Sequence, residues 1–150
     1  MKKLKTVLTA IVLLLTVSVF ANDPEIVTPR VKGAFEKDFI KAKDVNWVKK
    51  ADFYFAWFNL NNFKMNAAYN EAGELLSTSR ELSLAQLPLN ITLSIAQKYE
   101  KYTLPETATE LNFNGETYYY LNVYNAKHSL KLKFSTYGDV TIIEKLNKKQ

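Results

Sequence analysis

The chain has 150 residues, of which 47% are hydrophobic, a formal net charge of +5 and no cysteine. A chain of this length can bury a core without cross-links, and the lack of cysteine excludes both disulfides and lipid attachment at a processed cysteine. Because the chain also contains only one histidine, it lacks the ordinary ligands of a zinc site.

The N-terminal stretch has the pattern of a secretory signal peptide. Three lysines precede an uncharged apolar run over residues 7–20, and the small residues Val19 and Ala21 fit a cleavage site after residue 21. The run is short for a membrane span, although an N-terminal anchor is the alternative interpretation. We therefore predict a signal peptide over residues 1–21, a periplasmic destination with secretion as the alternative, and no stable membrane anchor after cleavage.

Most of the positive charge belongs to this leader. Removing residues 1–21 takes away three lysines and no acidic residue, so the net charge of the remaining 129 residues falls to +2. Phosphate recognition needs a clustered basic surface, and a chain this close to neutral offers none. The charge pattern therefore predicts no nucleic-acid partner.

Two segments have helical periodicity. In the first, Thr28 is a candidate N-cap, Pro29 takes the first helical position, and Val31, Phe35 and Phe39 share one face. The second begins at Pro88 and places a matching apolar stripe on one face, made of Ile91, Ile95, Tyr99 and Tyr102. We expect each helix to cover a sheet with its apolar face.

Each helical segment is followed by short alternating segments that predict about four antiparallel strands. Asn114-Gly115 is a strong hairpin signal, because both central residues of a type I′ turn need positive φ. The expected strands span residues 46–49, 53–59, 64–69 and 74–82, and then residues 110–113, 116–124, 130–135 and 140–145.

The two strand blocks resemble one another. Residues 52–76 match residues 117–141 without a gap at a shift of 65 positions, with aromatic residues aligned and Gly73 falling on Gly138. This match predicts an α+β fold in which a helix plus about four antiparallel strands is repeated in tandem. Residues 22–150 are expected to form a single domain made of two repeats, about residues 28–82 and 88–146.

Strand alternation predicts which face each side chain takes. In the segment from Leu130 to Phe134, leucine and phenylalanine alternate with lysine, and buried lysines are very rare, so the apolar face is the one that a helix covers. Carried to the neighbouring strands, this places Tyr119, Leu121, Val123, Tyr54, Ala56 and Phe58 in the core, with Met65, Ala67 and Tyr69 beside them.

The remaining side chains form a candidate binding surface on the opposite, open face of the sheet. Soluble monomers seldom expose large contiguous apolar patches without a use, and tyrosine and tryptophan dominate binding hot spots. Covering by a loop, a homodimer contact, or simple cross-strand stacking are alternatives that stay open. The predicted binding residues are Phe53, Phe55, Trp57, Tyr118, Tyr120, Lys131 and Lys133.

No catalytic constellation is found in the sequence. His128 lacks an oriented partner in its vicinity and is expected to be a surface turn residue. The four glycines form no phosphate-binding loop, and the carboxylates lack the spacing of a calcium loop. We therefore expect no enzyme, no cofactor and no metal, and instead either a protein or peptide partner of unknown identity or, alternatively, a small ligand or lipid bound along the aromatic side chains.

The sequence resembles the PepSY-like, β-lactamase-inhibitor-like family of exported bacterial proteins. The likeness is carried by "DVNW", "YFAWF", "AAYNEAGELL" and the "LP" before the second helix. It covers nearly all of the chain after the leader. Its signature positions are Val45, Trp47, Tyr54, Ala56, Phe58, Tyr69, Gly73, Leu87 and Pro88.

This resemblance implies a tandem α+β domain with helices packed on one face of a mostly antiparallel sheet. In the family's inhibitory member the open face of the sheet holds an enzyme, so the resemblance also implies a protein-binding or inhibitor-like role. The inhibitory contacts have no matching motif here and the disulfides of that inhibitor are absent, so no functional residue is carried over.

Overall fold

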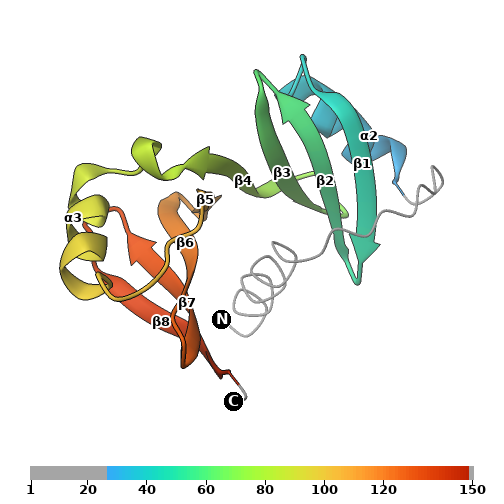
Figure 1. Ribbon diagram of the computed structural model, residues 1–150. Coiled ribbons are helices and arrows are strands. Elements are labelled where there is room, and N and C mark those ends of the chain that lie inside the picture. Colours follow the sequence, from blue (N-terminus) through green and yellow to red (C-terminus); the bar gives the residue numbers. More distant parts are fainter. Residues whose placement is uncertain (1–26, 149–150) are drawn as a thin grey trace. The chain divides into compact units, whose positions relative to one another are not determined.

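The computed structural model describes residues 27–148 (Figure 1), so the predicted signal peptide lies outside the described residues. The described chain divides into two compact units, with the boundary after Thr78. Within residues 27–148, no helix is both long and apolar enough to cross a bilayer. In chain order the elements are α2 (Pro29–Asp38), β1 (Lys43–Lys50), β2 (Phe53–Leu60), β3 (Phe63–Asn70), β4 (Leu75–Ser83), the 3-10 helix η1 (Leu84–Gln86), α3 (Leu89–Lys98), β5 (Thr107–Phe113), β6 (Glu116–Tyr124), β7 (His128–Ser135) and β8 (Val140–Asn147).

The predicted fold class, an α+β tandem repeat of a helix and about four strands, is wrong. The strands belong to one eight-stranded sheet whose order is the chain order, β1 to β8. The described residues contain only two α-helices, of ten residues each, so the fold is mostly β. The sequence match at a shift of 65 positions reflects similar hairpins, and similarity between hairpins does not determine how their strands join into sheets.

The predicted first helix is confirmed, and the residues that form it show why. Thr28 is its N-cap, with its hydroxyl oxygen accepting from the Val31 amide at 3.4 Å, and Pro29 occupies the first turn, where no amide hydrogen is needed. The helix ends at Asp38, because the next residue, Phe39, has a non-helical backbone conformation. A turn follows, in which the Ala42 amide donates to the Phe39 carbonyl.

The first unit has its own core between α2 and the strands β1 to β3, which lie side by side in Figure 1. Val31 and Phe35 point down from α2 and meet the apolar face of β2 and β3. The Phe35 and Phe58 rings pack edge to face with centroids 5.0 Å apart. The predicted core face is confirmed here, since its buried members are Tyr54, Ala56, Phe58, Ala67 and Tyr69, with Met65 packed against them.

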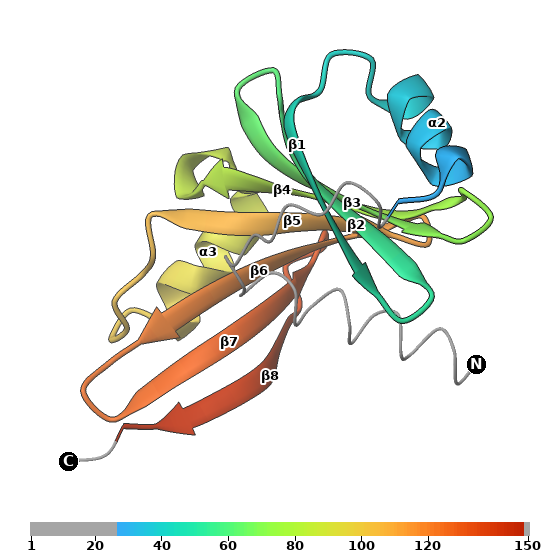
Figure 2. The ribbon, with the colours of Figure 1, turned by 90° about the vertical axis from the view of Figure 1, so that its right-hand side faces the viewer.

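The second unit has a separate core beneath α3 (Figure 2). Ile91 and Ile95 of α3 pack on β6 and β7, where register pairs Leu121 with Leu132 and Val123 with Leu130. Tyr119, Leu121, Val123, Leu130, Leu132 and Phe134 are all buried in this core, as predicted. The Arg80 guanidinium adds a two-point contact to the Glu110 carboxylate, with nitrogen to oxygen distances of 2.8 and 3.1 Å.

A glycine turn fits closely against the start of α3. Gly138, in the turn between β7 and β8, has φ +88°, and an added Cβ would lie 3.1 Å from the carbonyl oxygen of Asn90 in the first turn of α3. The Asn90 side-chain amide donates to the Thr136 carbonyl of the same turn at 2.6 Å. Both the positive φ and the close approach favour glycine at this position.

Candidate functional site

In the first unit, the predicted binding residues lie on β2 and face away from α2. Phe53 and Trp57 are half-buried, but only 1% of Phe55 is exposed. Phe55 lies between Val48 of β1 and Ala68 of β3 in the register, and its ring is 6.2 Å from that of Trp57. This face therefore presents Phe53 and Trp57 at partial exposure around a buried Phe55.

In the second unit, the predicted residues lie on β6 and β7 and face away from α3. Tyr118 is half-buried, whereas Tyr120 is only 4% exposed. The register places Tyr120 opposite Lys133 of β7 and Thr109 of β5. The second unit thus has the same arrangement of a buried aromatic ring beside a more accessible one.

The accessible group in the second unit is a compact cluster of Glu116, Tyr118 and Lys133. The Lys133 ammonium lies 3.5 Å from the centroid of the Tyr118 ring, and the Tyr118 hydroxyl donates to the Glu116 carboxylate. The bond to Glu116 is the main cause that raises the pKa of Tyr118, and burial lowers the pKa of Lys133. We refer to these three residues as the Tyr118 cluster.

Lys131 is half-buried on the same face of β7, and burial also lowers the pKa of its ammonium group. Lys131 pairs across the strands with Asn122 of β6 and Glu144 of β8. Both predicted lysines thus lie on the face opposite α3, and Lys133 stacks on the Tyr118 ring of the predicted set.

The Tyr120 hydroxyl is the most unusual polar atom of this face. It is buried and has no hydrogen-bond partner within residues 27–148. Burial raises the pKa of Tyr120 to about 12. A buried hydroxyl without a partner lowers stability, so Tyr120 contributes to the fold through its ring and not through its oxygen.

The sequence interpretation missed two apolar residues of the same face. Leu111 and Phe113 of β5 are buried, and the register pairs them with Tyr118 and Glu116. The Asn114-Gly115 turn signals this pairing, because a two-residue hairpin turn fixes the register of the flanking strands. Among the seven predicted residues, the structure brings Phe55 to Trp57 and Tyr118 to Lys133.

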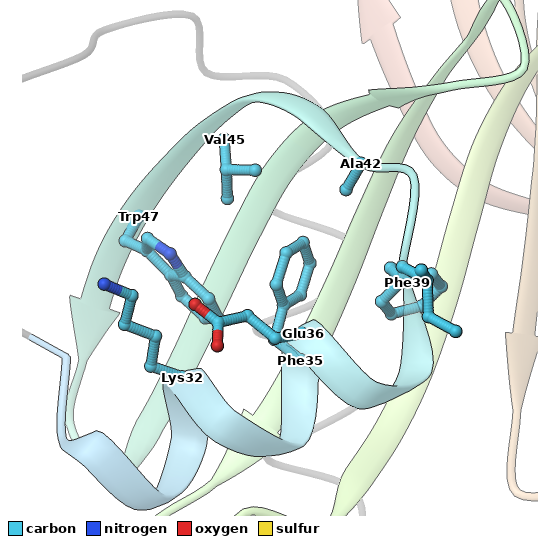
Figure 3. A pocket seen from close by; sticks show the side chains of 8 residues that line it. Lys32, Phe35, Glu36, Phe39, Ala42, Val45 and Trp47 are labelled. Atoms are coloured by element: carbon cyan, nitrogen blue, oxygen red, sulfur yellow. The ribbon is translucent and has the colours of Figure 1, made fainter.

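A pocket of about 240 Å³ lies in the first unit, between α2 and β1 (Figure 3). None of the seven predicted binding residues lines it. The pocket is bounded by the turn after α2 and by an irregularity in β1, where Asp44 has φ 53° and its carboxylate accepts from the Asn59 side chain at 2.8 Å. Its lining residues are Lys32, Phe35, Glu36, Phe39, Ile40, Ala42, Val45 and Trp47.

Titratable side chains do not gather into a metal centre within the described residues, 27–148, where no three His, Asp or Glu residues could hold an ion together. His128 is half-buried at the start of β7, and its backbone amide donates to the Asn125 side chain at 2.8 Å. His128 is therefore the first residue of β7, next to the turn between β6 and β7, and not the surface turn residue that the sequence predicted.

Comparisons with known proteins identify the fold. No protein-family model matches the chain, and no curated protein matches it. A β-lactamase-inhibitor-like protein from Bacteroides fragilis is similar with a TM-score of 0.71 at 18% identity, covering 82% of this chain and 89% of the other. A protein of the DUF2874 family from Bacteroides ovatus has a TM-score of 0.70 at 22% identity, covering 85% and 89%. A Bacteroides eggerthii protein provisionally described as periplasmic has a TM-score of 0.71 at 17% identity, covering 81% and 88%.

The resemblance predicted from the sequence is confirmed at the level of the fold. The chain shares the fold of β-lactamase-inhibitor-like and DUF2874 proteins, and at these identities the likeness concerns the fold alone.

Proposed function

We propose that the protein is an exported, periplasmic, non-catalytic module that binds a protein or peptide through the sheet faces turned away from its helices. Export is supported by the signal-peptide pattern and by the neighbour provisionally described as periplasmic. An inhibitor-like role is supported by the shared fold of the β-lactamase-inhibitor-like neighbour.

The observation that carries the proposal is the partial exposure of aromatic side chains on these faces. Phe53 and Trp57 in the first unit and Tyr118 in the second are all half-buried. Aromatic rings gain further burial in an interface at low entropic cost, and tryptophan and tyrosine are among the residue types that dominate binding hot spots. Lys133, stacked on Tyr118, adds a positive charge.

On each face, the buried ring and the half-buried rings have different roles. Phe55 and Tyr120 are buried already, so they hold the faces in shape and offer little surface to a partner. Binding therefore falls to Phe53, Trp57, Tyr118 and Lys133, which is a subset of the seven residues predicted from the sequence.

The proposal is tested by affinity capture from a periplasmic extract. We expect Trp57→Ala and Tyr118→Ala each to weaken the capture of a specific protein that the wild type retains. Tyr137→Ala is the matched control, because Tyr137 is 86% exposed in the turn between β7 and β8. If the wild type and the three variants captured the same proteins in the same amounts, the proposal would be refuted.

Folding is checked in the same samples by urea unfolding. A loss of more than roughly 2 kcal/mol in Trp57→Ala would place Trp57 in the core, since truncation of a core aromatic costs about 3 to 5 kcal/mol. A ligand carrier that uses the same aromatic faces is the alternative function, but the pocket of the first unit lies on the helix side of the strands.

A further inference from the structure

The pocket between α2 and β1 has the build of a small-molecule site separate from the sheet faces. Its walls are Phe35, Phe39, Val45 and Trp47. The Phe35 ring packs edge to face against Trp47 with centroids 5.1 Å apart and lies 5.3 Å from Phe39. These contacts fix the apolar walls, so the pocket is formed before anything enters it.

Unused polar groups surround the opening. The Trp47 indole N–H has no hydrogen-bond partner within residues 27–148, and Lys32 and Glu36 form no ion pair in the same part of the chain. Figure 3 shows Lys32 and Glu36 extending from α2, with Lys32 beside Trp47 and the Glu36 carboxylate between Lys32 and the Phe35 ring in this view. A lysine one turn before a glutamate is the weaker order for a helical ion pair, which leaves both charges available to a ligand.

Ile40 adds an exposed apolar side chain to the lining of the pocket. Its side chain lines the pocket but is 85% exposed, which makes it one of the most exposed large apolar side chains among the described residues. An apolar ligand in the pocket would cover part of Ile40 and remove this surface from water.

The size of the pocket limits the ligand. About 240 Å³ is more than the roughly 150 Å³ of an apolar cavity that binds benzene, and less than the roughly 300 Å³ at which pockets for drug-sized molecules begin. The pocket therefore suits one aromatic ring or branched aliphatic group with a small polar head.

From this geometry we infer that the pocket binds a free apolar α-amino acid, such as phenylalanine. The side chain enters between Phe35, Phe39 and Val45. The α-carboxylate accepts from the Trp47 indole N–H and pairs with Lys32, and the α-ammonium pairs with Glu36. A zwitterion is the kind of ligand that uses both donors, Trp47 and Lys32, together with the acceptor, Glu36.

The test is a titration of the nitrogen-15-labelled protein with L-phenylalanine, followed by the indole N–H signals. We expect the Trp47 signal to move, and the Trp57 signal, which comes from β2, to serve as an internal reference. Lys32→Met and Glu36→Gln should each weaken binding roughly tenfold, since each removes one charge-assisted contact. Lys37→Met is the matched control on the exposed side of α2 and should bind as the wild type does.

Single-charge analogues and a blocked pocket complete the experiment. 3-Phenylpropionate lacks the ammonium and 2-phenylethylamine lacks the carboxylate, so each should bind roughly tenfold more weakly than phenylalanine. Val45→Phe should abolish binding because the larger side chain fills the pocket. The amide signals of this variant should stay dispersed, which shows that it is folded. An unmoved Trp47 signal up to the solubility limit of phenylalanine would overturn the inference. So would equal binding of 3-phenylpropionate, which would indicate an apolar site without zwitterion recognition.

Discussion

Tyr69 and Tyr120 show how differently two buried tyrosine hydroxyls can be placed. Tyr69 is fully buried, and its hydroxyl donates to the Asp38 carboxylate at 2.9 Å, which ties β3 to the end of α2. The Tyr120 hydroxyl is buried without a partner in the described residues. The hydroxyl group therefore stabilises the fold at Tyr69 and destabilises it at Tyr120.

Removing each hydroxyl should separate these effects. We expect Tyr69→Phe to lower the free energy of unfolding by roughly 1.5 to 3 kcal/mol, because a hydrogen bond to a charged group is lost. Tyr120→Phe should leave it unchanged or raise it by up to about 1 kcal/mol. Urea unfolding of the two variants beside the wild type measures both values, and an equal loss in the two variants would contradict this interpretation.

At the same scale, the sequence predicted which side chains face the helices but not how exposed the others are. Alternation with Lys131 and Lys133 was enough to place Leu130, Leu132 and Phe134 in the core. Alternation assigns a face and says nothing about what covers that face. The burial of Phe55 and Tyr120 therefore could not be derived from it.

At the scale of elements, Gly33 lowers the stability of α2. This glycine lies inside the helix with a helical backbone, and an added Cβ would meet no atom within 4 Å. Gly33→Ala should therefore raise the free energy of unfolding by roughly 0.5 to 1 kcal/mol, because alanine loses less backbone entropy in a helix. Thermal unfolding measures the change, and a lower midpoint would show that Gly33 has another role.

Gly138 should respond in the opposite direction. Gly138→Ala combines positive φ with a Cβ placed 3.1 Å from the Asn90 carbonyl oxygen, and we expect a loss of roughly 2 kcal/mol or more. Gly115→Ala is the control, because Gly115 has φ +78° but no atom within 4 Å of an added Cβ. Its cost should be only about 1 kcal/mol. Equal losses at the two turns, measured by urea unfolding, would exclude the contact with α3 as the cause.

Elements with strong local signals were predictable and their assembly was not. Thr28 and Pro29 marked the start of α2, and Asn114-Gly115 marked the hairpin between β5 and β6. The eight-stranded order depends on pairings between strands of different hairpins, for which the sequence carries no local signal. The pocket was missed for a related reason, since it results from the irregularity of β1 beside α2 and not from a motif.

For the whole molecule, the two units share one chemical feature, which is a set of tyrosines that hold their protons more tightly than usual. Burial is the main cause that raises the pKa of Tyr69 in the first unit, and of Tyr99, Tyr119 and Tyr120 in the second. The bond to Glu116 raises the pKa of Tyr118. The stability of the protein should therefore depend on alkaline pH.

The sign of this dependence follows from where the protons are bound. Above pH 10, the ordinary pKa of tyrosine, the unfolded chain loses protons that the folded chain keeps, so the free energy of unfolding falls as pH rises. Below pH 10 the contribution of these tyrosines is fully present. For Tyr120, whose pKa is raised to about 12, the loss between pH 10 and pH 12 amounts to roughly 2 to 3 kcal/mol.

Lys131 and Lys133 act in the opposite sense, because burial lowers the pKa of each and favours the neutral amine in the folded protein. A comparison of the wild type with Tyr120→Phe cancels their effect, since both proteins carry the two lysines. Urea unfolding at intervals from pH 8 to above pH 11 should show a steeper fall for the wild type than for Tyr120→Phe. Parallel curves would mean that the Tyr120 hydroxyl ionises in the folded protein as readily as in the unfolded chain, and would contradict its burial.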